Sequence, residues 1–173
     1  MKPRMMPLVA LGLVGCVTYA PPQTSAPATL PPAPVRASFD RTWSTVIDFF
    51  ADNAIPVKTI DRASGYIAAE RIGAGNNAKW ADCGKLSGAL MSEKGGGGPV
   101  APQQALFNVR VRGDSVASTV QVVVRWTAVA AAQVVSSGFG SRPSNSYDQT
   151  VCVTTNVWER EAIREITRRA ETR

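Results

Sequence analysis

The sequence contains no histidine. Histidine is the usual general base beside a catalytic serine and a common metal ligand, so its absence excludes a hydrolytic triad of the usual kind. The fallback, a Ser-Lys pair, lacks support because Lys85 and Ser87 show no Ser-x-x-Lys pattern. Four acidic residues lie in or near expected turns, where carboxylates usually cap backbone amides: Asp61, Glu70, Asp82 and Glu93. We therefore predict a protein without catalytic activity, cofactor, metal or small-molecule substrate.

The chain also lacks clustered positive charge and long apolar runs. Its formal net charge is +6, but the basic residues are spread along the sequence and no five of them occur in a row. Nucleic-acid-binding proteins usually carry a basic patch or stripe, so we expect no nucleic acid partner. No apolar run approaches the ~20 residues that a transmembrane helix needs. Any membrane attachment must therefore come from something other than a spanning helix.

The N-terminus has the features of a signal peptide. Lys2 and Arg4 precede an apolar stretch over residues 8–14, which is too short to span a bilayer. The stretch closes on Leu13-Val14-Gly15-Cys16, which resembles the lipobox of bacterial lipoproteins. That resemblance implies cleavage of the Gly15–Cys16 bond, attachment of a diacylglycerol to Cys16 and N-acylation by a fatty chain such as palmitate. Two alternatives stay open: a secretory signal that ends by chance at a cysteine, and a cytosolic chain with an apolar N-terminus.

Only three cysteines are present, and lipid attachment would consume one of them, Cys16. The other two, Cys83 and Cys152, would reach an oxidising compartment after export, so we predict a disulfide bond between them. In the chain-entropy model a loop of this length contributes roughly 4 kcal/mol by constraining the unfolded chain. The alternative is a pair of buried free thiols. A zinc site is disfavoured because isolated cysteines lack the paired spacing that zinc ligands show.

Proline distinguishes the segment that follows Cys16. Residues 17–38 are rich in Pro, Ala, Thr and Ser, a composition that cannot bury a core. We predict that residues 16–38 form a lipidated tether, partly in the polyproline II conformation, which holds the domain off the bilayer. A proline-recognition motif is the alternative interpretation. Residues 1–15 would be the signal peptide, and residues 39–173 have the length of one domain.

Helical spacing of apolar residues predicts one helix at each end of this domain. The first begins after Ser38, a suitable N-cap, and Asn53 can end it in a left-handed conformation. Its apolar face comprises Phe39, Trp43, Val46, Ile47 and Phe50. The closing helix follows a cap at Thr154, Thr155 or Asn156, with Glu159 in a capping box if Asn156 is the cap. Its apolar face comprises Trp158, Ala162, Ile163 and Ile166.

Two strand hairpins are predicted between the helices. The first joins residues 55–60 to 65–72, and Pro56 places the earlier strand at a sheet edge. The second joins residues 105–112 to 116–129, where apolar and polar residues alternate, as in an antiparallel sheet with one buried face. The expected buried positions are Ala105, Phe107, Val109 and Val111, and then Val116, Val120, Val122, Val124 and Trp126. Residues 73–104 are predicted to form a long loop with a mobile glycine-rich tip at 95–99.

This order of elements predicts an α+β fold, a single two-layer domain whose antiparallel sheet is covered on one face by the N-terminal and C-terminal helices. Trp43 to Phe50, followed by Ile55 to Asp61 and Gly65 to Ile67, resembles the small outer-membrane lipoproteins of the NlpB/BamC type. The resemblance covers residues 39–72 and, more loosely, residues 152–166. It implies a helix-grip-like domain with a non-catalytic accessory role in the cell envelope.

Two functions are compatible with these features. The first is a lipoprotein of cell-envelope assembly or scaffolding that binds an envelope protein or complex. Its possible contact residues are Trp80 in the long loop and Arg164 and Arg168 on the closing helix, although these arginines also suit a solvated helix face. The second is a module that binds peptidoglycan or inhibits a wall-degrading enzyme. Val17 rather than aspartate follows Cys16, which favours the periplasmic face of the outer membrane by the enteric sorting pattern, with the inner membrane as the alternative.

Overall fold

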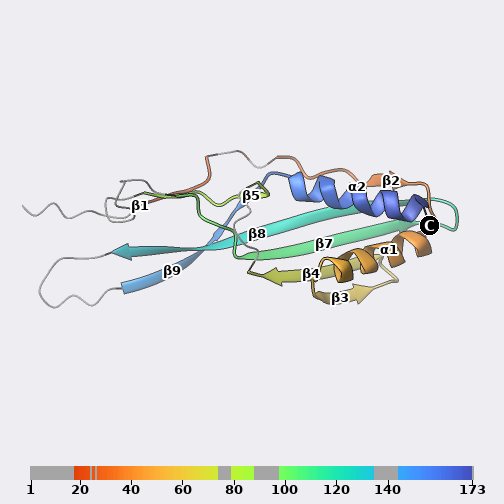
Figure 1. Ribbon diagram of the computed structural model, residues 1–173, viewed down its shortest axis with the longest axis horizontal. Helices are drawn as coiled ribbons and strands as arrows, with labels where there is room; N and C mark the ends of the chain where they lie inside the picture. Colours follow the sequence, from red (N-terminus) through yellow and green to blue (C-terminus); the bar gives the residue numbers. More distant parts are fainter. Residues whose placement is uncertain are drawn as a thin grey trace, which may run out of the picture.

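The computed structural model describes residues 18–23, 25, 27–73, 79–87, 98–134 and 144–172, so Gly15 and Cys16 lie outside the described residues. In chain order the elements are β1 (Thr18–Ala20), β2 (Ala33–Val35), α1 (Phe39–Asp52), β3 (Val57–Asp61), β4 (Tyr66–Ile72), β5 (Ala81–Asp82), β6 (Lys85–Ser87), β7 (Gln104–Gly113), β8 (Ser118–Val134), β9 (Ser144–Val151), β10 (Val153–Thr154) and α2 (Val157–Thr172). Within these residues, two helices accompany a six-stranded antiparallel sheet of order β2-β8-β7-β4-β3, with β9 also paired to β8 (Figure 1).

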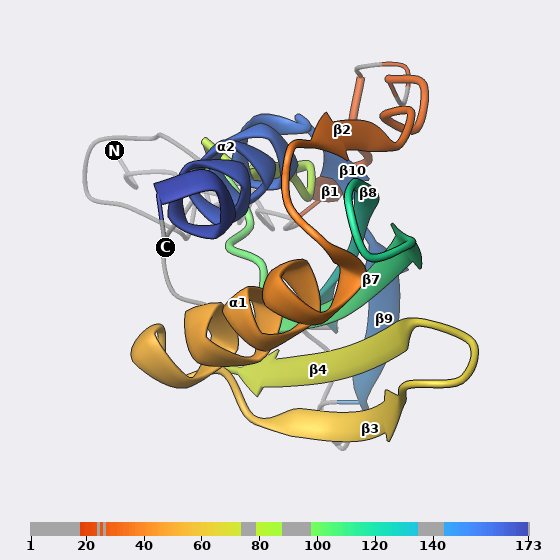
Figure 2. The same ribbon diagram turned by 90° about the vertical axis from the view of Figure 1, so that its right-hand side faces the viewer.

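Both helices lie on the same side of the sheet, as the view in Figure 2 shows. α1 contacts β7 and β8, α2 contacts β8, and the helices contact each other. The predicted α+β class and the placement of the helices on one face are therefore confirmed.

α1 follows the sequence prediction at its start but not at its end. The Ser38 side chain accepts a hydrogen bond from the Arg41 backbone N–H, at 3.3 Å, and the apolar face buries Trp43 and Phe50. The prediction that Asn53 adopts a left-handed conformation is wrong, since its φ is −90°. Ala54 takes the positive φ instead, at 51°, while the Asn53 side-chain amide donates to the Phe49 carbonyl oxygen.

Both predicted hairpins are present. β3 pairs with β4 at the edge of the sheet, as Pro56 indicated, and β7 pairs with β8 from Gln104 opposite Thr127 to Gly113 opposite Ser118. The alternating apolar residues of β7 and β8 are buried as expected, with one exception. Val116 is 77% exposed because it belongs to the turn, where the Asp114 carboxylate accepts its backbone N–H at 2.7 Å. The buried alternation of β8 therefore begins at Ser118, not at Val116.

The predicted tether is partly folded onto the domain. β2 lies within it and pairs antiparallel with β8, Ala33 opposite Val120 and Val35 opposite Ser118. Val35 is 1% exposed, so this segment contributes to the core despite its prolines. The prediction that residues 16–38 form a tether with no part in the core is therefore wrong at β2, which lies before the predicted boundary at residue 39.

The long segment between the hairpins is also less irregular than predicted. It contains β5, which pairs with β10, and β6, which pairs with β1. These strands have two or three residues each, too few to leave a clear periodic signal in the sequence. The predicted mobile tip at residues 95–99 lies mostly outside the described residues.

α2 begins without the predicted capping box. The Thr155 hydroxyl accepts the Val157 backbone N–H at 3.4 Å, whereas Asn156 has a φ of 57°, unlike the extended backbone of an N-cap residue. The Glu159 carboxylate accepts a hydrogen bond from the Thr154 hydroxyl at 2.7 Å. Glu159 is consequently turned into the protein, where it is only 2% exposed.

Aromatic rings join the two layers around Phe107, which is 1% exposed. Its ring centroid lies 4.5 Å from that of Trp158 on α2, 6.0 Å from Phe50 on α1 and 6.1 Å from Trp126 on β8. Ring pairs at these separations contribute about 0.5–1.5 kcal/mol each beyond their buried area. Phe107 therefore fixes both helices against the central strands.

Candidate functional site

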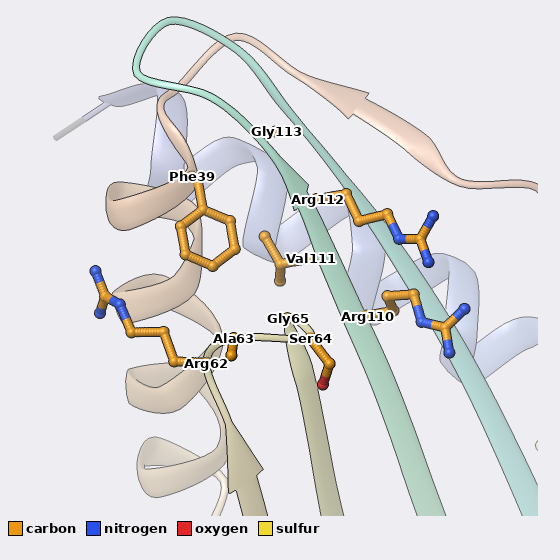
Figure 3. A pocket seen from close by; sticks show the side chains of 9 residues that line it. All are labelled: Phe39, Arg62, Ala63, Ser64, Gly65, Arg110, Val111, Arg112 and Gly113. Atoms are coloured by element: carbon orange, nitrogen blue, oxygen red, sulfur yellow. The ribbon is translucent and has the colours of Figure 1, made fainter.

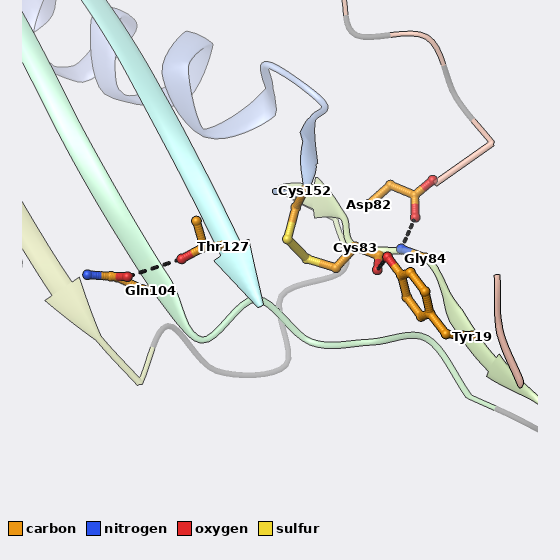
Figure 4. Close-up of a disulfide and its surroundings, with 7 residues drawn as sticks. All are labelled: Tyr19, Asp82, Cys83, Gly84, Gln104, Thr127 and Cys152. Atoms are coloured by element: carbon orange, nitrogen blue, oxygen red, sulfur yellow. Dashed lines mark hydrogen bonds between the residues drawn. A yellow bond between two sulfur atoms is a disulfide. The ribbon is translucent and has the colours of Figure 1, made fainter. Parts of the chain in front are cut away.

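The two cysteines outside the lipobox-like motif form a disulfide bond, as predicted, and the alternative of two free thiols is wrong. Cys83 follows β5, Cys152 precedes β10, and 69 residues separate them in sequence. Figure 4 shows the bond beside Tyr19, whose hydroxyl donates to the Cys83 carbonyl oxygen at 2.9 Å. The Cys152 backbone N–H donates to the Trp126 carbonyl oxygen at 2.9 Å. The junction thus ties the N-terminal segment, the long loop and β8 together.

The segment before α1 is fastened to the domain at several further points. Asn156 at the start of α2 donates from its side chain to the Ala28 carbonyl oxygen at 2.9 Å. Gln121 on β8 donates to the Leu30 carbonyl oxygen at 3.2 Å, and β2 then joins the sheet. β1 pairs with β6 near one end of the molecule and β2 lies near the other, so the described part of this segment runs along the domain (Figure 1). The position of Thr18 is therefore fixed relative to the fold.

β8 and β9 continue beyond the rest of the sheet as a two-stranded ribbon. The β7 pairing stops at Gln104 opposite Thr127, whereas β9 pairs with β8 from Thr127 opposite Val151 to Val134 opposite Ser144. Figure 1 shows this ribbon extending from the end of the molecule at which β1 lies. β1 also contacts β8, which confirms that the two are neighbours.

The sheet surface opposite the helices, which we name the open face, is covered by neither α1 nor α2. Its side chains alternate with the buried ones along the three central strands and include Tyr66, Ala68, Glu70, Leu106, Asn108, Arg110, Arg112, Gln121, Val123 and Arg125. Glu70 forms an ion pair with Lys58 at 3.3 Å and accepts from Gln104. The Gln104 hydrogen bond, followed by the hydrogen bond and charge of Lys58, lowers the pKa of Glu70.

Positive charge on the open face is not compensated within the described part of the chain. Arg110 and Arg112 on β7 and Arg125 on β8 are exposed, and none of the three forms an ion pair with a described acidic residue. A depression of about 170 Å³ beside Arg110 is lined also by Tyr66 and Val123. The open face therefore combines unpaired guanidinium groups with aromatic and aliphatic surface.

A wider depression of about 570 Å³ lies at the far end of the sheet, between the turn after β3 and the end of β7. Figure 3 shows Phe39 and Val111 facing each other across it, while the guanidinium groups of Arg110 and Arg112 point away from Phe39. Arg62, on the other side, is paired with Asp40 at 2.6 Å. This depression offers apolar contact but no set of polar groups that converge on one point, which a catalytic site requires.

The partner-contact residues predicted from the sequence differ in their surroundings. Trp80 is half-buried and stacks on Trp126, with ring centroids 5.8 Å apart, so it mainly packs against the core. Arg168 is bound to Glu165 at 2.7 Å, and its hydrogen bonds, with those of Arg169, lower the pKa of Glu165 to about 2. Arg164 is exposed on the same helix. Arg110, Arg112 and Arg125 were not predicted to be partner-contact residues, although they alternate with buried residues along the two strands of the second predicted hairpin.

Glu159 is a buried carboxylate at a gap in the sheet edge. β2 pairs with β8 only as far as Val120 and β9 starts opposite Thr127, which leaves the intervening edge of β8 without a strand. The Glu159 carboxylate lies near Val124 in this gap, where the Val124 backbone N–H acts to lower its pKa, while its Oε2 has no hydrogen-bond partner among the described residues. Burial raises the pKa of Glu159, and the Thr154 hydroxyl opposes that shift only in part.

We expect Glu159→Gln to flatten the pH dependence of stability. A carboxyl whose pKa is raised by folding stabilises the native state below its unfolded pKa, and that contribution is lost as pH rises through the folded pKa. The variant keeps an acceptor for Thr154 but has no charge to bury, so it should exceed the wild type at pH 8 by on the order of 1 kcal/mol. Urea unfolding of the wild type and of the variant at pH 4 and pH 8 measures the free energy of unfolding of each protein at each pH. Glu161→Gln controls for the loss of one negative charge. A constant difference at the two pH values would contradict the expectation.

The described residues hold no group of three or more His, Cys, Asp or Glu side chains that could bind a metal. No helix among them has the length and apolar character needed to cross a membrane. Comparison with known proteins gave no match to a protein-family model, a curated protein or a solved structure.

Proposed function

We propose that this chain is a lipid-anchored lipoprotein of the cell envelope that acts by binding another envelope protein. The observation that carries the proposal is the lipobox-like motif ending at Cys16, together with the disulfide bond between the other two cysteines. Disulfide bonds persist in oxidising compartments, so the Cys83–Cys152 bond supports export, which the motif also implies. The sorting pattern after Cys16 supports the periplasmic face of the outer membrane.

The lipid anchor is tested by Cys16→Ser. We expect the wild-type protein to fractionate with membranes, because two or more acyl chains give near-permanent attachment, and the variant to appear as an unprocessed or soluble species. Intact mass of the mature N-terminus supplies the direct measurement, since diacylglycerol and an N-linked acyl chain add a defined mass. An unacylated mature N-terminus would refute the anchor whatever the fractionation shows.

The partner surface in this proposal is the open face, and its partner is an envelope protein with an acidic surface. Arg110, Arg112 and Arg125 supply charge that no described acidic residue pairs with, and Leu106 and Val123 add apolar area between them. Arginine is enriched at protein interfaces because its guanidinium binds carboxylates in a bidentate manner and stacks on aromatic rings. α2 is the weaker candidate, because Arg168 already pairs with Glu165.

Reversing two charges on the open face tests this surface. We expect Arg110→Glu/Arg125→Glu to lower recovery of the co-purifying envelope protein at least about tenfold, since like charges at an interface cost several kcal/mol. Cross-linking in intact cells followed by affinity purification and mass spectrometry measures the recovery. Arg164→Glu, the reversal of a single charge on α2, serves as the control, and Arg110→Glu alone is its match on the open face. Loss of the partner in the α2 variant alone would place the interface on the helix layer instead.

The same arginines could also pair with the carboxylates of peptidoglycan, which is the second candidate function. Retention of the purified protein on isolated peptidoglycan, abolished by Arg110→Glu/Arg125→Glu, would favour it over an envelope protein. Recovery of a membrane protein complex with no retention on peptidoglycan would favour the first function.

A further inference from the structure

The N-terminal contacts determine which end of the domain would face the membrane. β1 begins at Thr18, so only Val17 separates it from Cys16, and two residues span at most about 7 Å. β1 is held in place by its pairing with β6 and by the hydrogen bond from Tyr19 to Cys83. A lipid on Cys16 would therefore lie close to this end of the domain and would not be separated from it by a long flexible tether.

The ribbon of β8 and β9 extends from the same end (Figure 1). Its backbone pairing runs over seven residue pairs past the point where β7 stops, from Ala128 opposite Thr150 to Val134 opposite Ser144. A two-stranded ribbon is at best marginally stable in water on its own, because three strands or a packed face are normally needed. β1 contacts β8, but among the described residues no third strand pairs with the ribbon beyond Thr127, so a further neighbour would stabilise it.

The sequence of the ribbon indicates the chemistry of that neighbour. From Trp126 to Ser141 the chain contains no Asp, Glu, Lys or Arg, and residues 128–135 are all Ala or Val except Gln133. Exposed edge strands usually carry charges, prolines or bulges that prevent association. β3 shows this protection, with Pro56 before it, a register shift after Val57 and the charged Lys58. The β8 half of the ribbon has none of these features.

We propose that the β8–β9 ribbon rests on the lipid bilayer that holds Cys16, so that the domain contacts the membrane at two points. The inference depends on the proposed lipid anchor. The β8 half of the ribbon, uncharged and rich in Ala and Val, would bury apolar area at the boundary between headgroups and acyl chains, while the polar β9 half, which contains Asp148, would face the headgroups and water. The acyl anchor would keep the ribbon at high local concentration there. The disulfide junction holds the base of the ribbon beside β1, which fixes both contacts on one end of the protein.

Fluorescence from labelled cysteines tests the proposal on the full-length lipidated protein in vesicles of phosphatidylethanolamine and phosphatidylglycerol. Ala131→Cys carries an environment-sensitive dye in the ribbon, and Gln133→Cys provides a second position should the first variant fold poorly. The native cysteines do not compete, since Cys83 and Cys152 are bonded and Cys16 is acylated in the proposed state. Val116→Cys, in the exposed turn at the opposite end of β8, is the matched control.

We expect nitroxide-bearing lipids to quench both ribbon labels at least about threefold more than the Val116→Cys label, since only the ribbon would enter the headgroup region. Equal quenching in protein that floats with the vesicles would overturn the membrane contact and leave the anchor intact. A blue-shifted ribbon label that lipids do not quench would also overturn it, in favour of a protein neighbour such as a second copy. Protein that fails to float and carries no lipid mass would refute the anchor itself.

Discussion

Replacing Cys83 and Cys152 together by alanine is expected to lower the free energy of unfolding by about 4 kcal/mol, the loop-entropy value for two cysteines 69 residues apart. The bond closes a loop that includes β7, β8 and β9, so its loss frees much of the unfolded chain. Its local surroundings offer little to replace it, because β5 and β10 form only two residue pairs with each other. We therefore expect the N-terminal contact through Tyr19 to weaken as well.

Urea unfolding followed by tryptophan fluorescence measures the expected loss, with the wild-type protein in excess dithiothreitol as a matched control. The reduced wild type and the double alanine variant should unfold at similar urea concentrations, because both lack the cross-link. If the reduced protein kept the stability of the oxidised protein, the bond would contribute nothing and the entropic argument would fail. A variant much less stable than the reduced wild type would instead indicate that the sulfur atoms themselves fill the site.

The central sheet and both helices could be predicted because each carries a local periodic signal. Phe107 and Trp126 belong to strands in which apolar residues alternate with polar ones. This alternation is typical of a strand with one buried face and does not fit a helix. α1 could be located from Ser38 and its apolar stripe. Val116 shows the limit of the method, since it continues the alternation but lies in a turn that Asp114 organises through its carboxylate.

The N-terminal segment could not be predicted because its partners are distant in sequence. Nothing near Ala33 or Val35 indicates that a proline-rich stretch pairs with β8, whose partner residues lie more than eighty positions later. Composition argued for a free tether, whereas hydrogen bonds from Gln121 and Asn156 to backbone carbonyl oxygens hold the segment in place. Such contacts use only backbone groups of the segment, so its side chains carry no sign of them.

The candidate site was predictable in part. The number of cysteines gave the disulfide bond, because the export that the lipobox-like motif implies would leave few other states for the remaining pair. Trp80 was selected as a possible contact residue because it lies in the predicted long loop, but stacking on Trp126 makes it mainly a core residue. Glu159 was interpreted as a capping residue, and its role at the β8 gap depends on where β2 and β9 stop, which no local pattern reveals.

A second large effect is expected from Gly65→Ala, at the turn between β3 and β4. Gly65 has a φ of +69°, and a Cβ placed there would lie 2.0 Å from the backbone oxygen of Val111 on β7. The same two residues are joined by a hydrogen bond from the Val111 N–H to the Gly65 carbonyl oxygen at 2.8 Å. Backbone cannot move aside as a flexible side chain can, so β4 and β7 would have to separate locally. We expect a loss of roughly 3–5 kcal/mol, combining left-handed strain with overpacking.

Gly73→Ala separates the two causes of that loss. Gly73 has nearly the same backbone conformation, with a φ of +73°, but a Cβ there would meet nothing within 4 Å. Its substitution should therefore cost only the conformational part, about 1–2 kcal/mol. Thermal and urea unfolding of the two variants give the difference, which estimates the cost of crowding Val111. If the two variants lost the same free energy of unfolding, β4 and β7 could separate locally at little cost. The close approach of Gly65 to Val111 would then not constrain the fold.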